Sequence, residues 1–255
     1  MGSIEGKTIV ITGGGSGIGR AIAKRFAADG ALVVATDIND QGLAALEGIE
    51  GILTTHADVS SWEQVRASVQ FAVDRTGKLD VYVNCAGIAL NTLLVDTDPA
   101  KFALLQSIHV NGCFYGMKAS LEHMRPQGSG NILNVISRVA ETGTPNTSAY
   151  GAAKAAMWVL NRVAAAENKD AGICINALFP GMSLTGMTKD GALGDPSHLG
   201  APDQEYDTFK MLATLDPGGD TGAVWSRGRV YPMFEGNDLS DLTGDLAAGR
   251  RGREK

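Results

Sequence analysis

The chain has 255 residues, a formal net charge of −6 at pH 7 and three cysteines. This length suits a single α/β domain over residues 1–255, and the negative charge argues against nucleic acid or an anionic membrane as a partner. The cysteines (Cys85, Cys113 and Cys174) show no paired spacing, so we expect a reduced, cytoplasmic compartment and no metal site. We also expect no secretory signal and no membrane span, because no apolar run is long enough.

The first clear local pattern is the glycine-rich stretch ITGGGSGIGR at residues 11–20. The run KTIVIT before it is rich in β-branched residues and predicts a buried strand. After it, Ile18, Ile22 and Phe26 stand at helical spacing, and Gly30 ends the predicted helix. A glycine-rich turn at a helix N-terminus gathers backbone N–H groups and binds phosphate. The alternative is a tight turn that binds no ligand.

Strands and helices alternate along the chain that follows. Apolar runs predict further strands at residues 31–37, 51–59, 79–87, 130–137 and 172–180. Residue patterns predict helices at 61–76, 99–124 and 148–168. Strands that are apolar on both faces and joined by helices predict an α/β fold, with a doubly wound parallel sheet and helices on both faces.

The segment 181–222 is rich in Gly, Asp and Pro and shows little periodicity. Long loops in compact domains are usually functional, and in an open α/β sheet this one follows a strand at the edge where ligands bind. We therefore expect residues 181–222 to form a substrate lid rather than a second domain.

The glycine stretch fits the pattern T-G-x-x-x-G-x-G through Thr12, Gly13, Gly17 and Gly19. With the motifs described below, it resembles the short-chain dehydrogenase/reductase family over roughly residues 6–186. The resemblance implies a Rossmann-type domain that binds a nicotinamide dinucleotide. The implied cofactor-binding residues are Gly13, Gly15, Ser16, Gly17, Ile18, Gly19, Asp37, Ile38, Asp58, Val59, Asn84, Ala86, Gly87, Tyr150, Lys154, Pro180, Gly181 and Thr185.

The second predicted strand ends in Asp37, eighteen residues after Gly19. A carboxylate there can bind both ribose hydroxyls of NAD and would repel a 2′-phosphate. No Arg or Lys precedes Arg20 in the glycine loop to offset that repulsion, so we expect NAD rather than NADP as the cofactor. The alternative is that Asp37 only caps the next turn, and Asp58 is open to the same interpretation.

Tyr150 and Lys154 stand at i and i+4 on one predicted helix, thirteen residues after Ser137. The resemblance implies a catalytic set of Asn111, Ser137, Tyr150 and Lys154. Tyr150 would be the general acid/base, and Lys154 and the nicotinamide ring would lower its pKa. Ser137 would hold the substrate oxygen, and Asn111 would anchor a water that connects Lys154 to solvent.

The implied activity is hydride transfer between NAD and a small secondary alcohol or ketone. One alternative is a regulatory protein that senses NAD without turnover, and another is a sugar-nucleotide epimerase or dehydratase. The candidate substrate contacts are mostly apolar: Ile88, Leu90, Val139, Thr144, Met182 and Leu184. Arg138 either pairs with Glu141 at the surface or binds a substrate carboxylate or phosphate.

The C-terminal part departs from the family pattern. Residues 237–246 resemble a late family motif, but the usual apolar strand ending in Asp-Gly-Gly does not follow, which puts the last strand in doubt. Residues 249–255 carry four basic side chains and predict a solvated, mobile tail. Relatives usually self-associate, so we expect a dimer or tetramer held through the helices around Asn111 and Tyr150. Met157, Leu160 and Val163 are the apolar residues expected at that interface.

Overall fold

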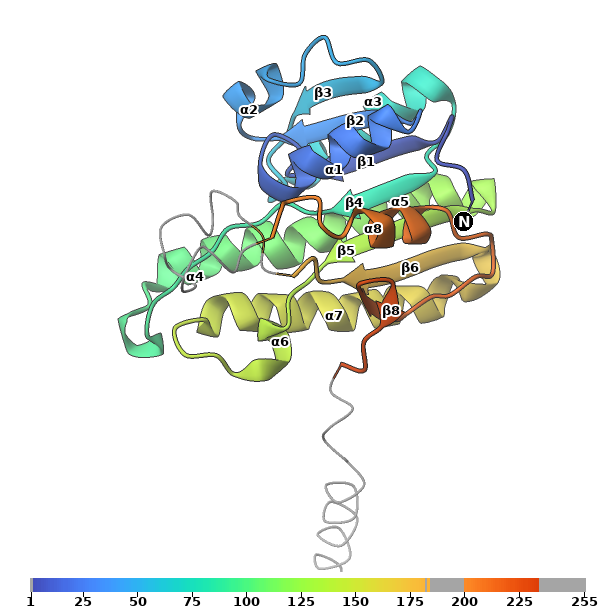
Figure 1. The fold of residues 1–255 in the computed structure, drawn as a ribbon. Helices are drawn as coiled ribbons and strands as arrows, with labels where there is room; N and C mark the ends of the chain where they lie inside the picture. Colours follow the sequence, from blue (N-terminus) through green and yellow to red (C-terminus); the bar gives the residue numbers. More distant parts are fainter. Residues whose placement is uncertain (1, 182, 184–199, 234–255) are drawn as a thin grey trace, which may run out of the picture.

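The computed structural model describes residues 2–181, 183 and 200–233, which form one sheet covered by helices (Figure 1). The strands are β1 (Thr8–Thr12), β2 (Leu32–Asp37), β3 (Ile52–His56), β4 (Val81–Asn84), β5 (Gly130–Val135), β6 (Ile173–Leu178), β7 (Val224–Ser226) and β8 (Arg229–Val230). The helices are α1 (Gly17–Ala28), α2 (Asp40–Ala44), α3 (Trp62–Thr76), α4 (Pro99–Gln106), α5 (Gly112–Gln127), α6 (Val139–Thr142), α7 (Ser148–Asn168) and α8 (Tyr206–Ala213).

The strand order is β3-β2-β1-β4-β5-β6-β7-β8, and every neighbouring pair is parallel except β7 with β8. The chain builds the sheet outward from β1 in one direction and from β4 in the other. This reversal is the point at which doubly wound sheets bind ligands, at the carboxyl ends of their strands. The predicted α/β fold is confirmed.

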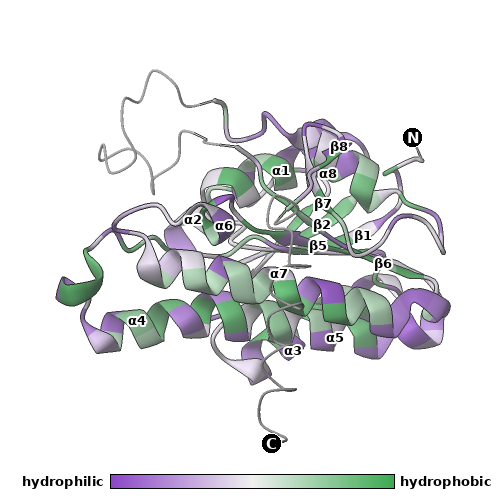
Figure 2. Cartoon of the chain, turned by 90° about the horizontal axis from the view of Figure 1, so that it is seen from below, coloured by the Kyte–Doolittle hydropathy of each residue, from purple (hydrophilic) through white to green (hydrophobic). Residues whose placement is uncertain are grey.

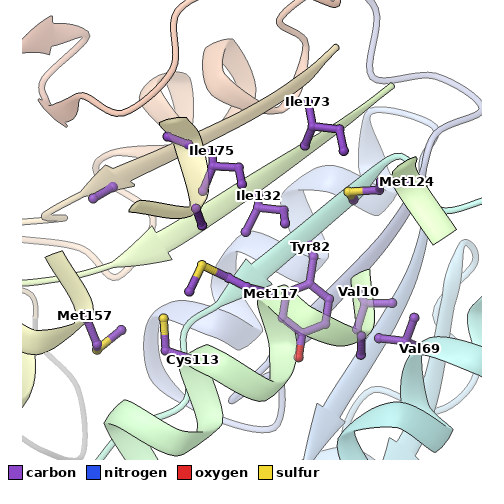
Figure 3. Close-up of a cluster of buried hydrophobic side chains, with 14 of the residues drawn as sticks. Val10, Val69, Tyr82, Cys113, Met117, Met124, Ile132, Met157, Ile173 and Ile175 are labelled. Carbon is purple, nitrogen blue, oxygen red and sulfur yellow. The ribbon is translucent and has the colours of Figure 1, made fainter. Parts of the chain in front are cut away.

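Buried apolar side chains pack the helices against both faces of the sheet. On one face, α3, α5 and α7 cover a core that includes Tyr82, Met117 and Ile132 (Figure 3). On the other face, α1 and α8 pack together (Figure 2). There Phe26 meets the ring of Tyr206 edge-on at 5.3 Å. Both faces of the central strands are therefore buried, which explains their continuous apolar runs.

Glycine is required where β1 turns into α1. Gly13 has a φ of +71°, and a Cβ on it would lie 2.9 Å from the Cα of Ala86, the second residue after β4. Thr12 ties the same two strand ends together, because its hydroxyl accepts hydrogen bonds from the N–H groups of Cys85 and Ala86. The two sides of the switch point are thus held in close contact.

The long helix predicted at 99–124 forms with a wider turn in its middle. It consists of α4, a π-helical turn at Ser107–Asn111, and α5, which continues to Gln127 and ends at Gly128 in the left-handed region. The prediction of a long helix is confirmed, and the π turn is a feature that the sequence analysis did not predict. The π turn lies in the wall of the ligand-binding edge described below.

The region expected to be an irregular lid contains structure of its own. Residues 206–213 form α8, whose Phe209 and Leu212 are buried against the sheet. That part of 181–222 is core rather than loop, whereas residues 182 and 184–199 lie outside the described residues. A further strand, β7, pairs in parallel with β6 through Ala177 opposite Val224. The doubted last strand, expected after residues 237–246, lies outside the described residues.

No helix in the described ranges is long and apolar enough to cross a membrane. The segments predicted at 237–246 and 249–255 lie outside the part of the chain that the structure describes.

Candidate active site

A cavity of about 1980 Å³ opens at the carboxyl ends of the parallel strands. It is larger than the roughly 300–1,000 Å³ typical of a site for one drug-sized ligand, which leaves room for two ligands end to end. Most of the sequence-predicted cofactor residues line it: Gly13, Ser16, Gly17, Ile18, Gly19, Asp37, Ile38, Asp58, Val59, Ala86, Gly87, Tyr150, Lys154, Pro180 and Gly181.

The N-terminus of α1 opens into this cavity. Ser16 has extended backbone and, among the described residues, its side chain makes no capping hydrogen bond. The first N–H groups of a helix lack partners within the helix and carry partial positive charge. A Cβ on Gly19 would collide with the backbone of Gly13, so the loop packs too tightly for side chains. This cradle fits the phosphates of a dinucleotide.

Asp37 lies beside the glycine loop. Its Oδ2 accepts a hydrogen bond from Gly15 N at 2.9 Å, and its Oδ1 accepts one from Asn39 N at 2.9 Å. The turn-capping interpretation is thus part of what Asp37 does, while the carboxylate still lines the cavity. Asp58 is similar, because its Oδ1 accepts hydrogen bonds from the N–H and hydroxyl of Ser60.

Ser137, Tyr150 and Lys154 meet deeper in the cavity. Tyr150 and Lys154 come from α7, and Ser137 follows β5. The Lys154 Nζ lies 5.5 Å from the Tyr150 ring centroid and donates a hydrogen bond to the Val135 carbonyl oxygen at 2.7 Å. The resemblance predicted that these three residues would share a site, and the structure brings them together.

Burial dominates the acid–base properties of this group. It lowers the pKa of Lys154 to about 8, and it raises the pKa of Tyr150 to about 12 despite an opposing hydrogen bond with Ser137. We expected Lys154 and the nicotinamide ring together to lower the Tyr150 pKa. In the protein alone, burial of the phenol raises that pKa, and the joint effect of Lys154 and a bound nicotinamide stays a prediction.

The fourth predicted member lies outside the cavity lining. Asn111 is exposed and does not line the cavity. His109, two residues earlier, is 1% exposed and lines the cavity. Helix residues two positions apart point to nearly opposite sides, which explains why His109 and Asn111 do not both face the cavity. The predicted role of Asn111 as the anchor of a water stays a prediction.

His109 is held in place by its neighbours. Its Nε2 lies 3.0 Å from Ile88 N and 2.9 Å from Ile88 O, and its ring meets the Tyr150 ring edge-on at 5.4 Å. Burial and the Lys154 charge lower its pKa to about 3, so the imidazole is neutral. Its Nδ1 has no hydrogen-bond partner among the described residues. The signal in the sequence is its spacing of four from buried Leu105.

The remaining predicted residues lie around the cavity or outside the description. Gly15 and Asn84 are buried behind its wall, and Leu90, like Tyr150, packs against the small buried cluster of Leu105, Ala149 and Ala153. Ile88, Val139 and Thr144 line the cavity as expected. Three predicted residues are not described: Met182, Leu184 and Thr185. Among the described residues, no group of three His, Cys, Asp or Glu side chains is placed to hold a metal.

Known proteins share this arrangement. Residues 7–193 match the family described as short chain dehydrogenase. The chain belongs to the short-chain dehydrogenase family. Levodione reductase of Leifsonia aquatica is 38% identical over 192 residues, 72% of each chain. An uncharacterized oxidoreductase of Mycobacterium bovis is 34% identical over 255 residues, covering 97% of this chain and 98% of its own.

Solved structures of family members agree with the fold. The crystal structure of levodione reductase superposes with a TM-score of 0.79 at 34% identity, covering 86% of this chain and 94% of that one. The 3-ketoacyl-(acyl-carrier-protein) reductase from Brucella melitensis, solved with NADH, gives a TM-score of 0.81 at 30% identity and covers 89% of this chain and 98% of that one. As a short-chain dehydrogenase, the chain is an oxidoreductase that binds a nicotinamide cofactor and acts on small molecules.

Substitutions at the two positions test whether His109 or Asn111 supports catalysis. We expect His109→Ala to lower kcat/KM by at least about tenfold, because the ring that packs against Tyr150 and fixes the Ile88 loop is lost. Asn111→Ala, a change at the exposed position, should leave kcat/KM within about twofold of the unchanged protein. Steady-state rates and melting temperatures of both variants decide the matter. A large loss in Asn111→Ala with none in His109→Ala would support the original assignment.

Proposed function

We propose that the protein transfers a hydride between NAD(H) and a secondary alcohol or ketone, with Tyr150 as the general acid/base. The observation that carries this proposal is the convergence of Ser137, Tyr150 and Lys154 in one cavity with the glycine cradle. The nicotinamide ring supplies the hydride chemistry, for which no side chain is suited. The chain itself must bind the substrate, align it and move one proton.

The proton transfer falls to Tyr150. In the oxidising direction its phenolate removes the hydroxyl proton, and in the reducing direction its phenol returns a proton to the forming alkoxide. Ser137 holds the same oxygen by a hydrogen bond, as its contact with Tyr150 allows. The pKa of about 12 in the protein alone must fall for turnover near neutral pH, and the positive charge of oxidised NAD next to the phenol favours that fall.

His109 takes a positioning role in this proposal. Its neutral ring packs against Tyr150, and its Nε2 fixes the backbone of Ile88 in the cavity wall. The ring therefore restricts the angle from which the phenol reaches the substrate oxygen. Lys154 is held from the opposite side by the Val135 carbonyl, and its ammonium is available to the nicotinamide ribose.

NAD is the proposed cofactor because Asp37 lines the end of the cavity beside α1. We expect NAD to be preferred over NADP by at least about tenfold, or roughly 1.4 kcal/mol of differential binding. Asp37→Ala should narrow this ratio by removing the charge that repels a 2′-phosphate. Asp40→Ala is the matched control, since Asp40 pairs with His56 outside the cavity. Dissociation constants for both dinucleotides measure the ratio, and a protein that binds NADP more tightly contradicts the assignment.

Tyr150→Phe tests the catalytic role. The ring packing is kept, so NAD should still bind, while turnover of secondary alcohols should fall by about a hundredfold or more. Tyr115→Phe is the control, because Tyr115 packs on Trp62 away from the cavity.

Oxidation by the unchanged protein should accelerate with rising pH as the phenolate forms, and ketone reduction should slow. Lys154→Met removes a nearby positive charge and should move the rising limb to higher pH. Binding of NAD without turnover of any alcohol would favour the sensor alternative.

Self-association is proposed through an apolar face of α5 and α7. Phe114, Val159 and Val163 are all about half exposed on these helices. Met157, expected at the interface, is instead buried inside the protomer at 1% exposure. An exposed patch of this kind marks a contact surface between proteins.

The mass of the protein in solution tests whether copies of the chain associate through this face. We expect at least a dimer by light scattering, and we expect Val159→Glu with Val163→Glu to reduce it to the monomer mass, because like charges would face each other across the contact. Truncation after Ala248 should leave the number of protomers in each particle unchanged. A monomer after truncation would place the interface in the tail instead.

A further inference from the structure

Three arginines that the proposed chemistry leaves unused line the cavity: Arg138, Arg227 and Arg229. Arg138 directly follows Ser137, and the other two belong to the turn between β7 and β8. All three are exposed, and among the described residues none forms an ion pair. Three guanidinium groups that have no ion-pair partner among the described residues therefore line one end of a cavity whose other end holds the carboxylates of Asp37 and Asp58.

Topology brings these arginines to the same edge of the sheet. Arg138 follows the carboxyl end of β5, and Arg227 follows the carboxyl end of β7, with only β6 between them. Strands in a sheet are about 4.8 Å apart, so two strand spacings amount to roughly 10 Å. Two extended arginine side chains can converge on one small group across that gap.

The arginine at the hairpin turn is not a residue the turn itself favours. Arg227 and Gly228 both have positive φ, at 51° and 69°. This two-residue turn prefers Asn, Asp or Gly at its first central position, and a bulky residue there is strained. Strain of this kind points to a side chain that is retained for function.

The hairpin is fixed in position by a buried carboxylate. Glu205, 6% exposed, accepts hydrogen bonds on Oε2 from Arg227 N at 2.8 Å and from the Thr208 hydroxyl at 2.9 Å. The Thr208 hydroxyl oxygen in turn accepts a hydrogen bond from Gly228 N at 2.8 Å. The turn is thereby tied to the start of α8, so the guanidinium groups project from a rigid base. Glu205 also lines the cavity, and its Oε2 already accepts the hydrogen bonds from Arg227 N and the Thr208 hydroxyl.

Arg138 is oriented by an aromatic partner. Its guanidinium carbon lies 5.5 Å from the ring centroid of Tyr231, the second residue after Arg229. Tyr231 donates its hydroxyl hydrogen to Glu141 Oε1 at 2.6 Å and meets the Phe179 ring edge-on at 4.6 Å. Arg138 and Glu141 thus share Tyr231 as a partner. Arg138 and Tyr231 both line the cavity.

We propose that this end of the cavity binds an anionic group of the substrate, a carboxylate or a phosphate, through Arg138 together with the Arg227–Arg229 turn. The inference rests on the proposed function, because the substrate carbonyl is taken to lie at Ser137 and Tyr150. Guanidinium groups bind both kinds of oxyanion through paired N–H donors. The substrate class is then a keto acid or a keto phosphate, or the corresponding hydroxy compound, rather than a neutral ketone.

Matched pairs of probes test the proposal. Aliphatic keto acids, with the carboxylate two to six carbons from the ketone, are compared with their methyl esters, and dihydroxyacetone phosphate is compared with dihydroxyacetone. NADH oxidation gives kcat/KM for each compound. We expect at least one acid or phosphate to exceed its neutral partner by about tenfold or more, and the two series separate a carboxylate from a phosphate site.

Two variants assign the preference to the arginines. Arg138→Gln and Arg227→Gly should each lower kcat/KM for the anion by about tenfold and change the neutral partner by no more than about twofold. Arg227→Gly suits the positive φ of the turn, so loss of folding does not explain its effect. Arg162→Gln, an equal charge change beside Trp158 on α7, should change neither rate.

Binding separates failure of this inference from failure of the proposed function. The melting temperature of the NADH complex is measured with each probe, for the unchanged protein and for Arg138→Gln. An anion that raises the melting temperature only in the unchanged protein supports the anion site even without turnover, while the absence of turnover itself contradicts the proposed function. Turnover of neutral ketones with no arginine-dependent preference overturns the anion site alone. Equal stabilisation of both proteins by every anion also overturns it.

Discussion

The hydrogen bond from the Lys154 ammonium to the Val135 carbonyl is the contact on which the site depends. Lys154 is 4% exposed, and a buried cation is tolerated only where a polar partner replaces part of its hydration. The bond joins α7 to the carboxyl end of β5 and so fixes the rotation of the helix. Tyr150, one turn earlier, then faces Ser137, which follows β5 by two residues. One contact thereby sets the relation between three groups from separate parts of the chain.

A chain of buried amides extends this anchoring behind the site. Asn84 on β4 donates to Asn134 on β5 at 2.8 Å, and Asn134 donates to Asn161 on α7 at 2.9 Å. Buried polar groups must be paired, so a slip of either strand or of the helix would leave several amides unsatisfied. The network therefore specifies the register of the elements that carry Ser137, Tyr150 and Lys154. It also explains why Asn84, predicted as a cofactor residue, lies behind the wall rather than in it.

The sequence predicted the elements whose signal is local, and it missed those that depend on packing. The strand before Gly13, the glycine turn and α7 each have a complete pattern within a few residues, and all three were predicted. The eight residues of α8 do carry apolar side chains at helical spacing (Tyr206, Phe209 and Leu212), but this short pattern stands in a segment rich in Gly, Asp and Pro and is predicted as part of a loop. These side chains are buried against α1 and the sheet. The choice between His109 and Asn111 required the helix rotation, which the π turn at 107–111 alters. The pKa of Tyr150 required its burial, which no motif encodes.

The charges around the cavity differ from end to end. The carboxylates of Asp37 and Asp58 lie at the end beside α1, and the buried ammonium of Lys154 lies at the middle. The guanidinium groups of Arg138 and the hairpin lie at the far end, together with the carboxylate of Glu205, which accepts a hydrogen bond from the hairpin backbone. In a cavity partly closed to water such charges act at longer range than at a free surface. Under the proposed assignments, the carboxylate of Asp37 would favour the ribose hydroxyls of NAD at one end, and the arginines would favour an anionic substrate group at the other. The two reacting atoms would then meet beside Tyr150.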